Sequence, residues 1–360
     1  MAKKVIKKAA KKTASKTVKK TASKAVKKTV TKVVKKASPK MSISKPLQKA
    51  AMIAVKDCMG VKENEQVMVL TDVNKKNIGV AIWEAAKKLN AEAILVEMKP
   101  RTTNGEEPPS AIANMMAASD VVLCPTTKSV THTNARINAC KAGARVSTLP
   151  GITEEAMVRC LNADYNKIAD LSIKLKAILD PAKIIRVTSK KGTDITLPKE
   201  GREAKADTGI VTEKGAMSNL PAGETFLAPL EGTSNGVIII DGAMSGVGLV
   251  KKEIKVIVKD GYADEFIGGA EAKALEKLLE PFGRDGRNIA EFGIGTNYKA
   301  KLTGLILEDE KVMGTIHIAF GNNKTMGGVC GVPIHLDGLV KNPTVEVDGV
   351  VIMKDGKFTI

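Results

Sequence analysis

The chain is poor in aromatic residues and in long apolar runs. Only 3% of its 360 residues are aromatic, so aliphatic side chains must build most of the core. No run of 18 apolar residues is present, which argues against a membrane span. The first residues also lack the apolar region of a secretory signal. We therefore expect a cytoplasmic protein without a membrane span.

Cysteine and histidine are equally scarce. The five cysteines are widely spaced and include no C-x-x-C pair, so the sequence favours neither a disulfide framework nor a zinc ribbon. Cys330, in a glycine-rich segment, is interpreted as a small packing residue, with a nucleophilic thiol as the alternative. The first half contains no G-x-G-x-x-G sequence, so a dinucleotide site is not supported.

Positive charge is abundant, but almost all of it lies at one end. The formal net charge is +18, and residues 1–40 contain 16 lysines and no acidic residue, which leaves 41 basic and 39 acidic side chains elsewhere. The lysines recur in four-residue units that keep no fixed helical face. We predict that residues 1–42 form a Lys-rich disordered tail. Its composition resembles linker-histone tails, which implies non-specific contact of residues 1–40 with nucleic acid or another polyanion. A solubilising extension without a partner is the alternative.

Beyond the tail, helical and strand patterns alternate as in a parallel sheet. Strands are expected at residues 66–70, 93–97, 121–124 and 144–148, with helices between them and another at 168–179. His132 falls in a strand-to-helix loop, where it caps the helix or lines a cleft. This pattern predicts an N-terminal parallel-sheet α/β domain at residues 43–182.

The pattern changes after residue 183 to short strands separated by Gly, Asp and Asn turns. The expected strands are residues 184–188, 193–197, 237–241, 254–259, 304–307, 316–320 and 345–351, interrupted by one helix at 270–279. We predict a β-rich α+β domain at residues 183–360 that carries the metal site.

Two of the three histidines lie 18 residues apart within this second half, His317 in an apolar strand pattern and His335 in the sequence HLD. On a strand, residues i and i+2 point to one face, so His335 and Asp337 project together. Imidazole combined with carboxylate oxygen suits zinc, cobalt, manganese or ferrous iron. The alternative for either histidine alone is a hydrogen-bonded core residue.

Four segments occur in the order found in one known family: residues 219–229 (NLPAGETFLAP), 288–295 (NIAEFGIG), 317–321 (HIAFG) and 335–337 (HLD). Over about residues 45–358 the chain resembles the thermophilic metalloaminopeptidases of the aminopeptidase T and aminopeptidase S type. The resemblance implies a homodimeric exopeptidase that hydrolyses peptide substrates through a metal-activated water. It also implies a divalent metal pair (zinc, cobalt or manganese) with these ligands: Glu224, Glu291, His317, His335 and Asp337. Glu224 or Glu291 would alternatively be the general base.

Two positions depart from that family. Five residues before His317 the family has a metal-binding carboxylate, but this chain has Val312, and the nearest acidic residue, Glu310, is displaced by two positions. Seven residues after His317 the family has a catalytic tyrosine, but this chain has Lys324. The cation of Lys324 is the candidate substitute for the tyrosine in stabilising an oxyanion.

These departures favour a rival reading within the same structural family, the mononuclear iron ring-cleaving dioxygenases of the 2,5-dihydroxypyridine type, with His317, His335 and Asp337 as iron ligands. A catalytically inactive polyanion-binding protein is the third hypothesis.

Overall fold

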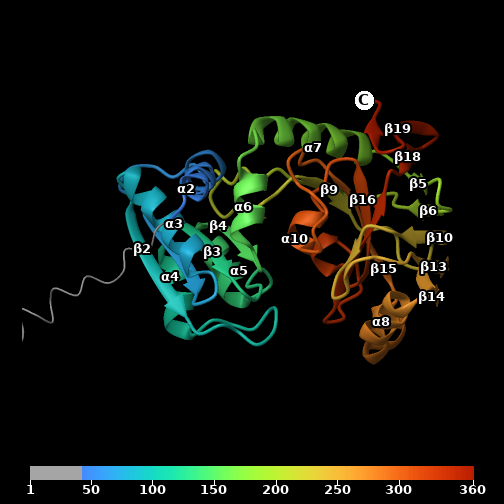
Figure 1. Cartoon of the computed structure of the whole chain (residues 1–360), viewed down its shortest axis with the longest axis horizontal. Coiled ribbons are helices and arrows are strands. Elements are labelled where there is room, and N and C mark those ends of the chain that lie inside the picture. Colours follow the sequence, from blue (N-terminus) through green and yellow to red (C-terminus); the bar gives the residue numbers. More distant parts are fainter. Residues whose placement is uncertain (1–42) are drawn as a thin grey trace, which may run out of the picture. The chain divides into compact units, whose positions relative to one another are not determined.

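The computed structural model describes residues 43–360, which belong to one unit (Figure 1). The first part of this unit is a parallel sheet in the order β2-β1-β3-β4-β8. Its strands are β1 (Gln66–Asp72), β2 (Glu92–Met98), β3 (Val121–Thr126), β4 (Arg145–Pro150) and β8 (Met217–Asn219). The predicted parallel α/β arrangement is confirmed.

Helices cover both faces of this sheet, because alternate residues of its central strands point into two separate cores. Val67 and Val69 of β1 belong to one core and Met68 and Leu70 to the other. The helical segments up to residue 179 are α2 (Lys45–Met52), η1 (Ile53–Cys58), α3 (Lys76–Lys88), α4 (Ser110–Ala118), α5 (Asn134–Lys141), α6 (Glu154–Leu161) and α7 (Tyr165–Leu179).

The second part contains two antiparallel sheets. The eight-stranded sheet has the order β14-β13-β10-β6-β5-β18-β19-β20. Its strands are β5 (Ile184–Thr188), β6 (Asp194–Pro198), β10 (Asn235–Ile240), β13 (Ile254–Lys259), β14 (Tyr262–Ile267), β18 (Thr344–Val347), β19 (Val350–Lys354) and β20 (Lys357–Phe358). The predicted β-rich second part is confirmed.

The seven-stranded sheet, in the order β12-β11-β17-β16-β15-β9-β7, carries the residues of interest. Its strands are β7 (Lys205–Asp207), β9 (Glu224–Leu227), β11 (Ala243–Met244), β12 (Gly248–Leu249), β15 (Ile289–Gly295), β16 (Thr315–Gly321) and β17 (His335–Lys341). The remaining helical segments are α8 (Ala270–Leu279), η2 (Glu280–Phe282), α9 (Gly283–Gly286), α10 (Ile306–Asp309) and η3 (Lys324–Met326).

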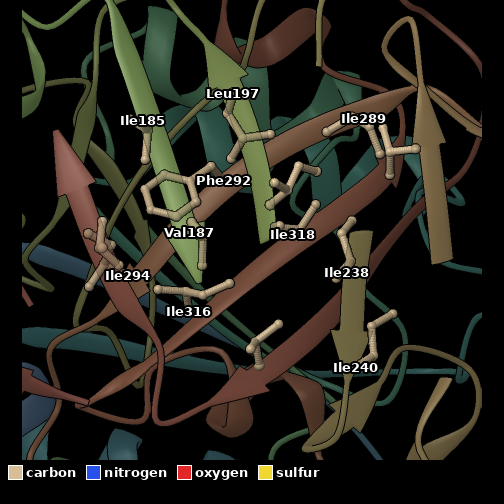
Figure 2. Close-up of a cluster of buried hydrophobic side chains, with 14 of the residues drawn as sticks. Ile185, Val187, Leu197, Ile238, Ile240, Ile289, Phe292, Ile294, Ile316 and Ile318 are labelled. Atoms are coloured by element: carbon tan, nitrogen blue, oxygen red, sulfur yellow. The ribbon is translucent and has the colours of Figure 1, made fainter. Parts of the chain in front are cut away.

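The largest core lies between the two antiparallel sheets (Figure 2). Phe292 and Ile294 of β15 and Ile316 and Ile318 of β16 are fully buried in it. They pack with aliphatic residues of the eight-stranded sheet, among them Ile185, Val187, Leu197, Ile238 and Ile240. Because side chains alternate along a strand, the residues between them point to the opposite face of the seven-stranded sheet.

Two expected strands were wrong in detail. Residues 304–307 include the start of the short helix α10, because the Asp309 carboxylate accepts hydrogen bonds from the backbone of Thr303 and Gly304 and closes a turn there. Residues 345–351 form a hairpin rather than one strand, because Asp348 and Gly349 both adopt positive φ and make a tight turn between β18 and β19.

The predicted tail, residues 1–42, lies outside the described residues. Between residues 43 and 360 no helix is long and apolar enough to cross a membrane. The predicted boundary at residues 182 and 183 stays a prediction, although the chain returns to the first sheet at β8 after forming β5 and β6.

Candidate metal centre

Polar side chains line one face of the seven-stranded sheet, on the strands β9, β15, β16 and β17. Each of them is paired in register with a very small residue, in the pairs Glu224–Gly295, His317–Gly293, Glu291–Ala319, Asp337–Ala319 and His335–Gly321. At Gly293 the space is fully used, because an added Cβ would lie 2.0 Å from Nε2 of His317. Glycine is therefore needed there to seat the imidazole over the strand.

Glu291 is the centre of the arrangement, because its two oxygens contact different histidines. Oε1 lies 3.2 Å from Nε2 of His317, and Oε2 lies 3.0 Å from Nε2 of His335. His317 also lies 3.3 Å from Oε2 of Glu224, and His335 lies 3.3 Å from Oδ1 of Asp337. The five ligand residues predicted from the sequence are thus brought together; their roles stay predictions.

These side chains form two groups whose donor atoms lie within 4.8 Å of one another. One group is Glu224, Glu291 and His317, the other is Glu291, His335 and Asp337, and Glu291 belongs to both. Imidazole and carboxylate donors fit a borderline divalent ion. Oε2 of Glu224 is buried and accepts no hydrogen bond from the described residues, as expected for an atom that faces a cation. The residues therefore fit a metal site.

Neighbouring groups orient the second donor group. Nδ1 of His335 lies 2.7 Å from the backbone oxygen of Asn322, to which it donates, so that Nε2 faces the carboxylates. The hydroxyl of Ser245 accepts a hydrogen bond from the backbone nitrogen of Asp337 at 3.1 Å and lies 3.4 Å from Oδ2 of the same residue. Such outer contacts fix the orientation and protonation state of metal-binding side chains.

Sequence reasoning missed Lys311, which is 1% exposed and surrounded by carboxylates. Its Nζ lies 2.5 Å from Oε1 of Glu224, 2.7 Å from Oε1 of Glu310 and 3.8 Å from Oδ2 of Asp207. In the sequence Lys311 lies between Glu310 and Val312, and a lysine beside an acidic residue is typical of a solvent-exposed position. The adjacent Glu310 was the one sign in the sequence that this segment lies near the centre. Glu310 contributes to the electrostatics of the centre despite its shift in sequence.

The protonation properties follow from burying many carboxylates together. Burial raises the pKa of Glu224 to about 8, despite the opposing effects of Lys311 and His317. Burial would also raise the pKa of Glu291, but hydrogen bonds from His317 and His335 hold it well below its usual range. Against their own burial, the carboxylates raise the pKa of His317 to about 9 and that of His335 well above its ordinary value. Without a metal, protons on the histidines partly compensate the negative charge.

The other candidate residues lie outside the two donor groups. Lys324 is exposed on η3, and the Cys330 thiol contacts the backbone oxygen of Asp285. His132 is not the cap of α5, because the Thr133 hydroxyl accepts the capping hydrogen bond from the backbone of Arg136. His132 is exposed, and its pKa is lowered by partial desolvation and by the positive charges of Arg136 and His335.

The fold and this face define a two-part α/β protein with a carboxylate and histidine centre on an antiparallel sheet. The chain belongs to the family described as NicX: 2,5-dihydroxypyridine 5,6-dioxygenase, whose model matches residues 47–360. It is 23% identical over 325 residues to the 2,5-dihydroxypyridine 5,6-dioxygenase of Pseudomonas putida, which covers 82% of this chain and 91% of that protein.

Two solved structures show the same fold. The 2,5-dihydroxypyridine dioxygenase of Pseudomonas putida KT2440 superposes with a TM-score of 0.77 at 22% identity, covering 88% of this chain and 98% of that one. Wild-type AmpT of Thermus thermophilus superposes with a TM-score of 0.67 at 17% identity, covering 89% and 100%.

The predicted membership in the aminopeptidase family is wrong, and with it the main reading of the chain as a peptidase or hydrolase. The family match over residues 47–360 overturns it and agrees with the rival reading, a ring-cleaving dioxygenase. One contact in the site was not expected for a metal pair: Oε1 of Glu224 lies against the ammonium group of Lys311. The role of Glu224 as a metal ligand stays a prediction.

Proposed function

We propose that residues 43–360 form a mononuclear iron-dependent dioxygenase that opens the ring of a dihydroxylated pyridine. Membership in the 2,5-dihydroxypyridine 5,6-dioxygenase family is the observation that carries this proposal. The donor chemistry of Glu291, His335 and Asp337 supports it, because one imidazole and two carboxylates are suitable ligands for ferrous iron.

In this proposal Glu291, His335 and Asp337 hold the iron. This set differs from the one expected from the sequence, because Glu291 rather than His317 shares a donor group with His335 and Asp337. When bound, ferrous iron supplies the one-electron chemistry that allows dioxygen to react with a closed-shell aromatic ring. The rest is done by the chain. His317 keeps Glu291 oriented through its 3.2 Å contact, and Ser245 keeps Asp337 in place.

Access to the centre is expected from the side of His335. The side chain of His335 is 31% exposed, whereas that of His317 is 1% exposed and lies deep against β15. A planar substrate therefore approaches past His335, with the buried carboxylates behind it. Burial of those groups keeps water from the reacting atoms and strengthens their electrostatic effect on the substrate.

Oxygen consumption tests the proposal directly. The protein is loaded with ferrous iron without air, and 2,5-dihydroxypyridine is then added in an oxygen-electrode cell. We expect one dioxygen per substrate molecule, with both atoms of labelled dioxygen in the ring-opened product. Separate samples of the metal-free protein, loaded with zinc, cobalt or manganese in place of iron, are not expected to hydrolyse leucine anilides. Peptide hydrolysis without oxygen uptake would refute the proposal.

Two variants separate the iron centre from its surroundings. His335→Gln removes a proposed ligand at similar size and is expected to abolish both iron binding and oxygen uptake. Cys330→Ser, a substitution on the neighbouring loop outside the donor groups, is expected to retain both. Unchanged oxygen uptake in His335→Gln would place the metal elsewhere.

A further inference from the structure

The two donor groups of the centre differ in one respect. Oε1 of Glu224, in the first group, lies 2.5 Å from the ammonium of Lys311, and the same ammonium lies 2.7 Å from Glu310. In the second group, Nε2 of His335 lies 3.3 Å from Asp337 and 3.0 Å from Glu291, and no lysine or arginine among the described residues forms an ion pair with either carboxylate. The ammonium group of Lys311 thus already neutralises negative charge in the first group.

We propose that Lys311 acts as a built-in cation that closes a latent second metal site formed by Glu224, Glu310, Glu291 and His317. The single metal of the proposed function then binds at Glu291, His335 and Asp337, so this inference rests on the proposed function for the identity of that ion. The latent site takes a divalent transition-metal ion of the same class when the ammonium is removed.

One buried atom without a hydrogen-bond partner points to a ligand at the latent site. Oε2 of Glu224 has no hydrogen-bond donor among the described residues, and the Glu224 side chain is buried. Oε2 faces Nε2 of His317 at 3.3 Å, so a carboxylate oxygen and an imidazole nitrogen already converge there. A set that holds an oxygen and a nitrogen donor this close suits a borderline divalent ion.

The ammonium and a second ion exclude each other by electrostatics. A metal bound by Glu224 would lie next to Nζ of Lys311, because both cations would share one carboxylate. Lys311 cannot swing away, since it is 1% exposed and contacts Glu224, Glu310 and Asp207 from within the fold. Repulsion between two cations at this separation, with little water between them, outweighs the remaining attraction of the carboxylates. Lys311 therefore sets the number of ions at one.

The test counts bound ions. Cobalt(II) is added to the full chain by equilibrium dialysis, and bound cobalt per chain is measured by elemental analysis for wild type, Lys311→Met, Lys311→Arg and the double variant Lys311→Met with Glu224→Gln. We expect one ion, two ions, one ion and one ion, respectively. The Arg variant is the matched control, because it keeps the positive charge while changing the side chain.

A second measurement keeps the inference falsifiable if Lys311→Met does not fold. Glu224→Gln alone is expected to keep the single ion, whereas Glu291→Gln is expected to lose it. Loss of the ion from Glu224→Gln, two ions in wild type, or one ion in folded Lys311→Met would each overturn the inference. One cobalt per wild-type chain and two per Lys311→Met chain, without oxygen uptake by the iron-loaded wild type, would refute the proposed function while supporting the role of Lys311.

Discussion

Replacing Gly293 with alanine tests the geometry of the centre most directly. The new Cβ would lie 2.0 Å from Nε2 and 2.2 Å from Cε1 of His317, so the imidazole must move by about 1.4 Å to reach an ordinary contact of 3.4 Å. His317 is fully buried, and overpacking of this kind costs about 1–3 kcal/mol. The shift also breaks the 3.2 Å contact with Glu291, and loss of such an outer partner lowers metal affinity by about 10- to 100-fold.

Two assays measure these effects separately. Urea unfolding in the presence of a chelator reports the packing cost, and anaerobic ferrous iron titration reports the affinity. Gly269→Ala is the matched control, because its Cβ meets the flexible side chains of Lys252 and Glu271 at 3.1 and 3.5 Å. A Gly293→Ala variant with the stability and the iron affinity of wild type would show that the imidazole is not seated over this strand.

Three further predictions concern stability, metal affinity and the N-terminal tail. Arg159→Ala should reduce the free energy of unfolding by about 3–5 kcal/mol in urea titrations, because it leaves the fully buried Glu308 carboxylate without its 2.6 Å partner. The control Lys183→Ala removes an exposed ion pair with Glu200 and should reduce the free energy of unfolding by less than about 1 kcal/mol. Burial would raise the pKa of Glu308, but the hydrogen bond from Arg159 holds that pKa below its ordinary value. The wild type should therefore lose the stability contributed by this ion pair as the pH falls below the ordinary glutamate pKa. Equal acid sensitivity in Arg159→Ala and wild type would contradict this. Neighbouring carboxylates raise the pKa of His335, so a proton on its imidazole competes with the metal. The metal affinity should therefore rise by up to about tenfold per pH unit until the pH passes that pKa. A metal affinity that does not change with pH in calorimetric titrations would contradict this. Deleting residues 1–40 should abolish salt-sensitive binding to DNA in gel-shift assays while oxygen uptake is retained, and retained DNA binding would refute a role for the tail.

Much of the fold was predictable from the sequence because periodicity reports burial. The parallel strands were recognised by their apolar runs, and the strand at residues 254–259 and the helix at 270–279 match the structure at both ends. The errors arose where a single side chain determines local structure. The turn closed by Asp309 and the positive φ of Asp348 depend on contacts that a hydrophobic pattern does not record.

The site was predictable in membership but not in its internal division. The order of Glu224, Glu291, His317 and His335 along the chain suggested one site, but the strand register that places them on one sheet face is seen only in the structure. Which oxygen faces which cation depends on Lys311, which follows α10 in the chain and contacts Glu224 of β9 only in the folded structure. The family was misjudged because the motif order resembles the aminopeptidases, whereas both AmpT and a 2,5-dihydroxypyridine dioxygenase share the fold of this chain.

The position of β8 has a consequence for how this protein can be divided. The strand Met217–Asn219 pairs with β4 and completes the first sheet after the chain has already contributed β5 and β6 to another. A fragment that ends at residue 182 would leave β4 as an edge with unpaired backbone groups, which invites association between copies. Gene fusions, truncations and recombination between relatives should therefore keep the segment up to residue 219 together with the sheet that it finishes.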